Sequence, residues 1–112
     1  MSPIILRHRI GSYYPLRNNN ERRLNLARVG PFVIGVPVFQ NWNTIGNDGA
    51  IPNPGGAQRG GHAMLVVGYD DVKRQFKVQN SWDKTWGDRG YGYIPYDWME
   101  NYSWSSWAAS RL

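Results

Sequence analysis

The side chains best suited to acid–base chemistry in this sequence are His62 and Asn80. A carboxamide oxygen can accept the proton of one imidazole nitrogen, which fixes the tautomer and leaves the other nitrogen free to take a proton from a nucleophile. A plainer interpretation is that His62 ends a strand and Asn80 begins a turn. The residue types alone favour neither interpretation.

The chain between these two residues predicts the β-hairpin that would bring them together. Residues 60–69 and 75–82 are rich in apolar and β-branched side chains, and they flank the charged segment 70–74. Two such runs on either side of a polar turn are typical of an antiparallel pair of strands. We therefore expect His62 and Asn80 at the open end of one hairpin.

The expected register follows from a turn centred on Asp71. It pairs Met64 with Val78 and Val66 with Phe76, which gives one apolar face. It also pairs His62 with Asn80. Directly opposed residues have Cβ atoms about 4.5–5.5 Å apart, so the imidazole and the carboxamide could form a hydrogen bond.

Residues 60–95 resemble the C-terminal half of papain-like cysteine peptidases. The resemblance rests on Gly61-His62-Ala63, on Val67-Gly68-Tyr69-Asp70 and on the run from Asn80 to Pro95. The family pattern is Gly/Asp-His-Ala, then Val-Gly-Tyr, then Asn-Ser-Trp-Gly-x-x-Trp-Gly-x-x-Gly-Tyr. Several Trp and Gly positions agree at fixed spacing, which makes the match specific. One departure is Asp83, where the family usually has glycine.

The resemblance implies roles for individual residues. His62 would be the general base, Asn80 its orienting residue, and Trp82 the ring that covers their hydrogen bond and excludes water. Substrate-binding positions would be Gly35, Gly61 and Ala63. Of these, Gly35 and Ala63 would lie near the pocket for the substrate side chain two residues before the cut bond. Their small size indicates a roomy pocket, or equally two small residues in a tightly packed sheet.

The sequence contains no cysteine, whereas papain-like enzymes attack with a thiolate. In the family, the nucleophile and the oxyanion-stabilising Gln come from the mainly helical N-terminal half. Ser81 is a poor substitute, because its side chain alternates to the other face of the strand from Asn80. We therefore expect a peptidase half-domain that is inactive alone, as a split subunit, a fragment or a truncated gene product. It would hydrolyse peptide bonds only if another chain supplies the Cys-bearing half.

Two other classes of function remain open. The first is a non-catalytic peptide- or protein-binding module derived from a papain-like peptidase. Its uncovered cleft face would favour a Cys-bearing partner chain or a homo-oligomer, since large apolar patches mark interaction sites. The second is single-stranded nucleic-acid binding by a basic, aromatic-rich protein. We disfavour nucleic acid because the peptidase-like motif already accounts for the aromatic residues.

Composition sets outer limits on the class of protein. The 112 residues predict a single domain over 1–112, and a net charge of +5 would suit an acidic partner or simply a solvated surface. The lack of cysteine excludes disulfides and thiolate zinc sites, and we expect no metal and no cofactor. We identify no signal peptide in the first residues and no membrane-spanning run, so the compartment stays unknown.

The remaining segments predict few regular elements. A short helix should begin at a cap formed by Asn18, with Glu21 completing a capping box and Leu24, Leu26 and Ala27 forming a narrow apolar face. Other expectations are an extended segment over 4–10 and 13–14, a buried strand over 32–39 in which Pro37 lies at an edge or bulge, a loop over 40–61, a strand over 90–94, and a tail over 96–112 without a recognisable motif.

The fold class that these segments predict is mainly β with one short helix, in the α+β class. The resemblance adds that the sheet should be antiparallel and barrel-like, as in the corresponding half-domain of the papain-like fold.

Overall fold

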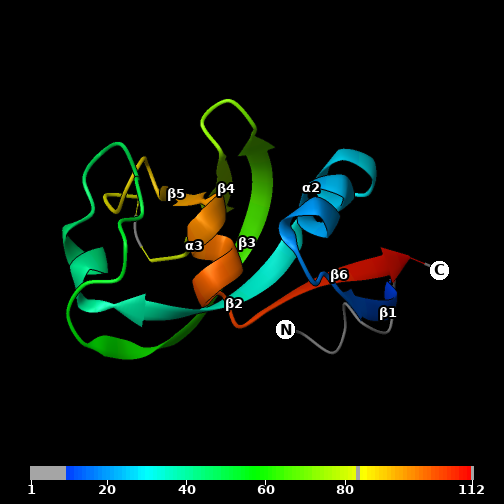
Figure 1. Cartoon of the computed structure of the whole chain (residues 1–112), viewed down its shortest axis with the longest axis horizontal. Helices are drawn as coiled ribbons and strands as arrows, with labels where there is room; N and C mark the ends of the chain where they lie inside the picture. The colour runs from blue at the N-terminus through cyan, green and yellow to red at the C-terminus, as the bar shows by residue number, and fades with distance from the viewer. Residues whose placement is uncertain (1–9, 83, 112) are drawn as a thin grey trace.

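A six-stranded sheet forms the body of the molecule, in the order β1-β6-β2-β3-β4-β5, and every pair of neighbouring strands is antiparallel. The computed structural model describes residues 10–82 and 84–111. Its elements are shown in Figure 1 and run in chain order: β1 (Ile10–Pro15), α2 (Asn19–Arg28), β2 (Phe32–Phe39), the 3-10 helix η1 (Gln40–Thr44), β3 (Gln58–Asp70), β4 (Gln75–Gln79), β5 (Tyr91–Pro95), α3 (Tyr96–Tyr102) and β6 (Ser105–Arg111).

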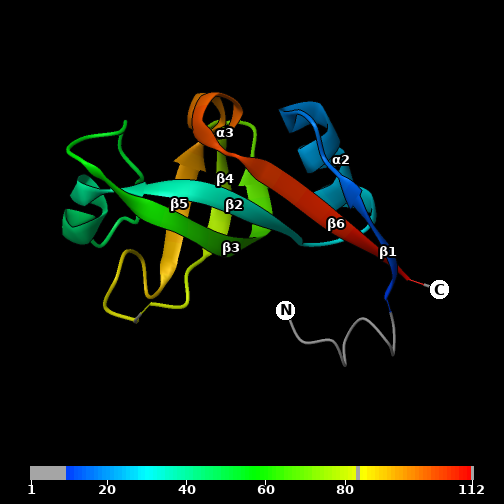
Figure 2. The same ribbon diagram turned by 90° about the horizontal axis from the view of Figure 1, so that it is seen from below.

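The predicted fold class, a mainly antiparallel β structure, is confirmed, with two differences. The sheet is open rather than barrel-like, because β1 and β5 are edge strands in the described chain. There are also two α-helices instead of one, since residues 96–111 contain α3 and β6. Figure 2 shows both helices above β2 and β6. No helix in the described parts of the chain is long and apolar enough to cross a membrane.

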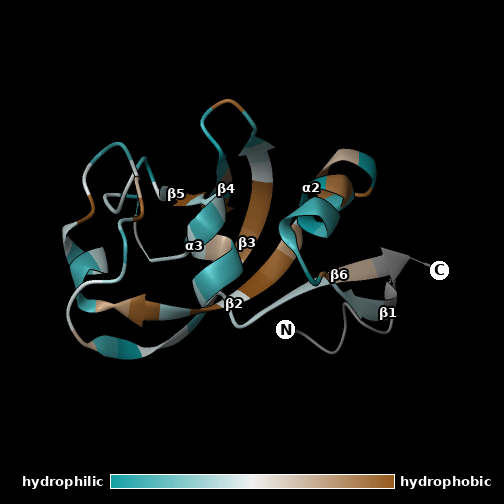
Figure 3. Cartoon of the chain, viewed as in Figure 1, coloured by the Kyte–Doolittle hydropathy of each residue, from teal (hydrophilic) through white to brown (hydrophobic). Residues whose placement is uncertain are grey.

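The core lies along the middle of the sheet. Ile34, Val66, Val78 and Ile94, one from each of β2 to β5, have no exposed surface, and Figure 3 shows the apolar stretches of β2 and β3 in brown. The expected apolar face of the hairpin is confirmed, because its other members are also buried: Met64 and Phe76. β3 and β4 therefore present their predicted side chains to the core.

The predicted register of the hairpin is wrong. Val66 pairs with Val78, a bulge follows between Val66 and Gly68, and Phe76 pairs with Tyr69. The turn causes the difference, because it is longer than a turn centred on Asp71. Its last residue, Arg74, has a left-handed backbone conformation with a φ of 55°. At Val66 the displacement from the expected register is two residues, which leaves each side chain on its predicted face.

The start of α2 is confirmed, whereas its predicted apolar face is mostly wrong. Asn18 caps the helix by accepting from the Glu21 backbone N–H at 2.9 Å. The Glu21 carboxylate accepts from the backbone N–H of Arg17 instead of closing a capping box on Asn18. Leu24 is 49% exposed and Ala27 is exposed, and only Leu26 packs against the core.

The buried face of α2 is polar, with Arg22 at its centre. Its Nε donates to Ser106 Oγ at 3.0 Å, and one Nη donates to Asn19 Oδ1 at 2.8 Å and to Glu100 at 3.2 Å. Burial lowers the pKa of Arg22, and the neighbouring Glu100 carboxylate opposes that shift. These hydrogen bonds compensate for the burial of the guanidinium. The buried face of α2 can therefore carry a cation where apolar side chains were expected.

Two further segments differ in detail from expectation. Pro37 lies in β2 beyond the point where β6 stops pairing, at Gly35, so it occupies an edge as predicted. The expected loop over 40–61 contains η1 and the first residues of β3. Of the extended segment expected over 4–10, all but Ile10 lies outside the described residues.

Tyr96 gives the fold a dependence on alkaline pH. Burial and a 2.6 Å hydrogen bond from its hydroxyl to Asp71 raise the pKa of Tyr96 to about 12. An unfolded tyrosine titrates near about 10. Between these values the folded state holds more protons, so the free energy of unfolding should fall as pH rises from about 10 to about 12. Urea unfolding at pH of about 9 and 11 measures this.

The control variants separate Tyr96 from the other tyrosines. Tyr96→Phe should show a smaller loss of stability between the two pH values than the unmodified chain. Tyr69→Phe, at an exposed position, should lose as much as the unmodified chain. Equal losses in both variants would contradict the assignment.

Candidate functional site

His62 and Asn80 are in direct contact, as the sequence predicted. His62 Nε2 lies 2.9 Å from Asn80 Oδ1. Because an amide oxygen only accepts, Nε2 carries the proton and Nδ1 is left as the basic nitrogen. Asn80 is 5% exposed and His62 is half-buried. The carboxamide that contacts the ring is therefore buried, whereas the imidazole can still be reached.

The two residues do not meet as directly opposed strand residues. The ladder between β3 and β4 ends at Leu65 and Gln79, so His62 and Asn80 lie beyond it. Asn80 instead takes its position from a 2.9 Å backbone hydrogen bond to the carbonyl of Gly90. His62 belongs to the part of β3 that pairs with β2, where it lies opposite Val36.

Trp82 covers one side of the imidazole. The ring centroids of His62 and Trp82 are 5.3 Å apart with an interplanar angle of 36°, and Trp82 is 41% exposed. The indole therefore lies between His62 and part of the solvent. Asp83, where the sequence departs from the family pattern, lies outside the described residues.

A buried tryptophan that the sequence did not single out holds Trp82 in place. Trp42 of η1 is fully buried and lies 6.2 Å from Trp82 and 5.9 Å from Trp98 between ring centroids. Trp86 packs edge-on against Trp82, and its Nε1 donates to the Trp42 carbonyl at 3.1 Å. The only sequence signal for Trp42 was a tryptophan within a segment expected to be a loop.

The three candidate substrate-binding residues lie together on paired strands. Gly35 pairs with Ala63, next to Gly61. Trp104 occupies the space beside Gly61: a Cβ there would lie 2.5 Å from its ring, and its backbone N–H donates to the Gly35 carbonyl at 2.9 Å. Ala63 is exposed. The sequence patterns do not indicate Trp104, whose side chain packs beside these small residues.

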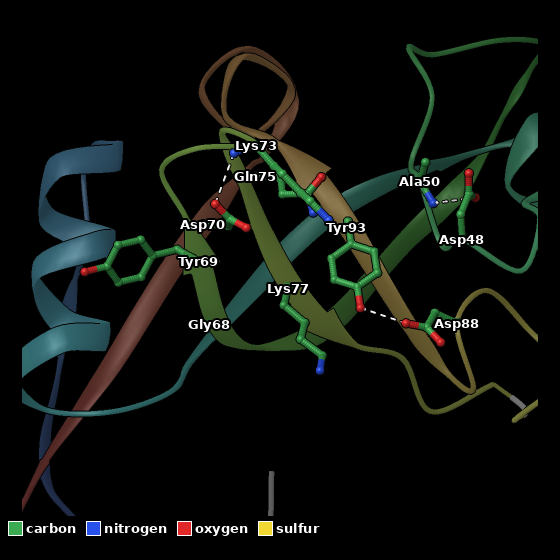
Figure 4. A pocket seen from close by; sticks show the side chains of 10 residues that line it. All are labelled: Asp48, Ala50, Gly68, Tyr69, Asp70, Lys73, Gln75, Lys77, Asp88 and Tyr93. Atoms are coloured by element: carbon green, nitrogen blue, oxygen red, sulfur yellow. Dashed lines mark hydrogen bonds between the residues drawn. The ribbon is translucent and has the colours of Figure 1, made fainter.

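A cavity of about 260 Å³ opens beside the imidazole. His62 and Trp82 line it together with Val38, Asn43, Arg59, Gly60 and Gly61. A larger cavity of about 540 Å³ lies over β3, β4 and β5, where Figure 4 shows Lys77 and Tyr93 side by side and Asp88 bonded to the Tyr93 hydroxyl. The two cavities share no lining residue. The described residues contain no group of three or more side chains suited to holding a metal ion.

Comparisons with known proteins point to one family. The sequence pattern of the papain family cysteine proteases matches residues 6–110. The chain is 33% identical over 96 residues to cathepsin C of Schistosoma mansoni, an alignment that covers 73% of this chain and 21% of that protein. It is 34% identical over 67 residues to peptidase 1 of Psoroptes ovis, which covers 58% of this chain and 21% of that protein.

Solved structures of cysteine proteases also resemble this chain. Xylellain, a cysteine protease from Xylella fastidiosa, matches with a TM-score of 0.80 and 33% identity over 92% of this chain and 41% of xylellain. Procathepsin B from Trypanosoma congolense matches in fold with a TM-score of 0.73 and 24% identity, over 92% of this chain and 36% of that chain. The chain thus spans about a fifth of the curated relatives and about two fifths of the solved ones. It belongs to the papain family of cysteine proteases.

Proposed function

We propose that this chain supplies the general base, His62, and its orienting residue, Asn80, for peptide-bond hydrolysis by a cysteine thiolate. The 2.9 Å contact between His62 Nε2 and Asn80 Oδ1 carries the proposal. With Nε2 held by the amide, Nδ1 takes the proton of the thiol, and the thiolate attacks the substrate carbonyl. The imidazolium then gives this proton to the leaving amine.

The thiol has to come from residues outside this sequence, which contains no cysteine. Ser81 follows Asn80 directly and is exposed. The carboxamide of Asn80 engages His62 Nε2, so the basic Nδ1 is not the nitrogen that faces this stretch of chain. Ser81 therefore has no role as nucleophile, and the chain is inactive until a Cys-bearing segment completes the site.

The substrate in this proposal is a peptide that lies along the paired strands β2 and β3. Ala63 is exposed and has a short side chain, so an extended substrate backbone can approach it closely, whereas the Trp104 ring and Ser105 Oγ fill the space beside Gly61 and Gly35. The Trp104 ring would contact the substrate side chain beside Gly61. Trp82 would exclude water from the His62–Asn80 hydrogen bond, which strengthens it.

A second candidate function, a peptide- or protein-binding module, has an observation of its own. Trp107, Val33 and Leu65 pair in register across β6, β2 and β3, and they are 43%, 36% and 36% exposed. A continuous apolar row on a sheet face favours a partner surface. We propose that it contacts the Cys-bearing segment or, in a purely binding protein, a second copy of this chain.

Labelling of the native protein tests both candidates. The chain is isolated from its source, treated with a thiol-directed electrophile, and every co-purifying species is identified by intact mass. We expect one cysteine-containing polypeptide to be labelled, and to be labelled faster when folded than in urea, because an activated thiol is largely thiolate. A partner without a reactive thiol would favour the binding module. Absence of any labelled species would contradict the catalytic proposal.

A further inference from the structure

Among the residues that the structure describes, Arg59 has the one charged side chain that lines the cavity beside His62. The other lining residues are His62, the neutral side chains of Val38, Asn43 and Trp82, and the two glycines. Arg59 is exposed, and within the described residues it makes no ion pair and no hydrogen bond through its side chain. A cation with no partner in the described part of the chain, in the same cavity as His62, is available to a ligand.

A β-bulge directs Arg59 into this cavity. Val38 pairs with Gly60 and Phe39 pairs with Gln58, so Arg59 is the extra residue on β3. The bulge is made possible by Gly60, whose φ of +123° is rarely adopted by other residues. Bulges re-aim a side chain that regular alternation would point elsewhere. The local backbone is therefore arranged to place this guanidinium.

The stretch of β3 between Arg59 and His62 carries no side chains of its own. The two residues that separate them are glycines, and a Cβ at Gly60 would meet nothing within 4 Å. A ligand group can therefore contact the imidazole and the guanidinium together. A guanidinium selects carboxylates, because its N–H groups match the two carboxylate oxygens.

We propose that Arg59 determines specificity by binding a substrate carboxylate on the side of His62 away from Ala63. The inference rests on the proposed function and on the position that the family resemblance implies for Ala63, beside the substrate side chain two residues before the cut bond. Along β3 the order Ala63, His62, Arg59 then places Arg59 beside the part of the substrate that follows the cut bond and leaves as the amine. The carboxylate is either an acidic side chain or the free C-terminus of that part.

Binding of dipeptides that mimic the released part tests the proposal. The probes are Ala-Glu-amide, Ala-Gln-amide and Ala-Gln with a free C-terminus, titrated into the whole chain while NMR follows the His62 ring and the Arg59 side chain. We expect at least one acidic probe to bind about twofold to fivefold more tightly than Ala-Gln-amide, as for an exposed ion pair. Which acidic probe gains affinity identifies the source of the carboxylate.

Variants show whether Arg59 is responsible. Arg59→Gln should remove the preference, Arg59→Lys should retain part of it, and the preference should shrink at about 1 M salt. Arg28→Gln is the matched control: it removes one positive charge from an exposed position on α2, and it should bind as the unmodified chain does. Equal affinity for all probes, no binding at all, or a preference that survives in Arg59→Gln would overturn the proposal.

The titration measures binding rather than hydrolysis. It therefore decides the role of Arg59 whether or not a thiol is ever found beside His62. Failure of the catalytic proposal appears separately, as the absence of a labelled cysteine in the native protein.

Discussion

Replacing His62 by alanine is expected to lower peptide hydrolysis by the assembled protease by about 10²–10⁴-fold, the usual contribution of a general base. In the proposed mechanism the imidazole removes the thiol proton and returns it to the leaving amine, so both steps would lose their proton carrier. Thiol alkylation at neutral pH should slow as well, because less thiolate is present. Both rates are measured on the native protein and on the variant, with circular dichroism to show that the fold is kept.

The same experiment extends to Asn80 and Ser81. Asn80→Ala should reduce kcat less than His62→Ala does, because the base remains and only its tautomer and orientation are released. Ser81→Ala is the matched control one residue away, and its rates should be unchanged. Full activity in His62→Ala, or a loss in Ser81→Ala comparable with that in His62→Ala, would refute the assigned roles.

The site was predictable from sequence where local patterns specify it. Two apolar runs around a charged turn predict that His62 and Asn80 are brought together, and the structure gives their contact as 2.9 Å. The core face of the hairpin was equally predictable, because strand alternation depends on residues two positions apart. Asn18 as a helix cap follows from the same kind of short-range signal.

The register was not predictable, because it depends on backbone geometry that residue types leave open. Asp70 Oδ1 accepts from the backbone N–H groups of Val72 and Lys73, and Arg74 takes a left-handed conformation. This lengthens the turn, and a bulge absorbs the odd residue. Asn80 still reaches His62, because its backbone bonds to Gly90 rather than to the opposing strand.

Long-range partners account for the other differences. The buried side of α2 looks wrong for a core until Arg22 is seen with Ser106 and Glu100, which lie 84 and 78 positions away. α3 and β6 form from a segment with no local motif, because β6 inserts between β1 and β2. Helix periodicity cannot anticipate a polar face whose partners come from the far end of the chain.

Local sequence patterns do not indicate the role of Trp42, and its replacement should cause the largest loss of stability. It lies in a segment that reads as loop, yet it is fully buried and in ring contact with Trp82, Trp86 and Trp98. Trp42→Ala should lower the free energy of unfolding by about 3–5 kcal/mol, the usual cost of removing a buried aromatic side chain. Urea unfolding monitored by circular dichroism measures this change.

Two tryptophan variants show whether packing is the cause. Trp107→Ala removes an indole that is 43% exposed, so it should cost much less than Trp42→Ala. Trp42→Phe should keep most of the stability, because it retains an aromatic ring and deletes an indole N–H that is buried without a partner in the described chain. Since Trp42 supports Trp82, the His62 ring should also become more solvent-exposed in Trp42→Ala, which NMR can detect. A loss of stability in Trp42→Ala no larger than in Trp107→Ala would contradict the role of Trp42 in the core. An unchanged exposure of the His62 ring would contradict its role in supporting Trp82.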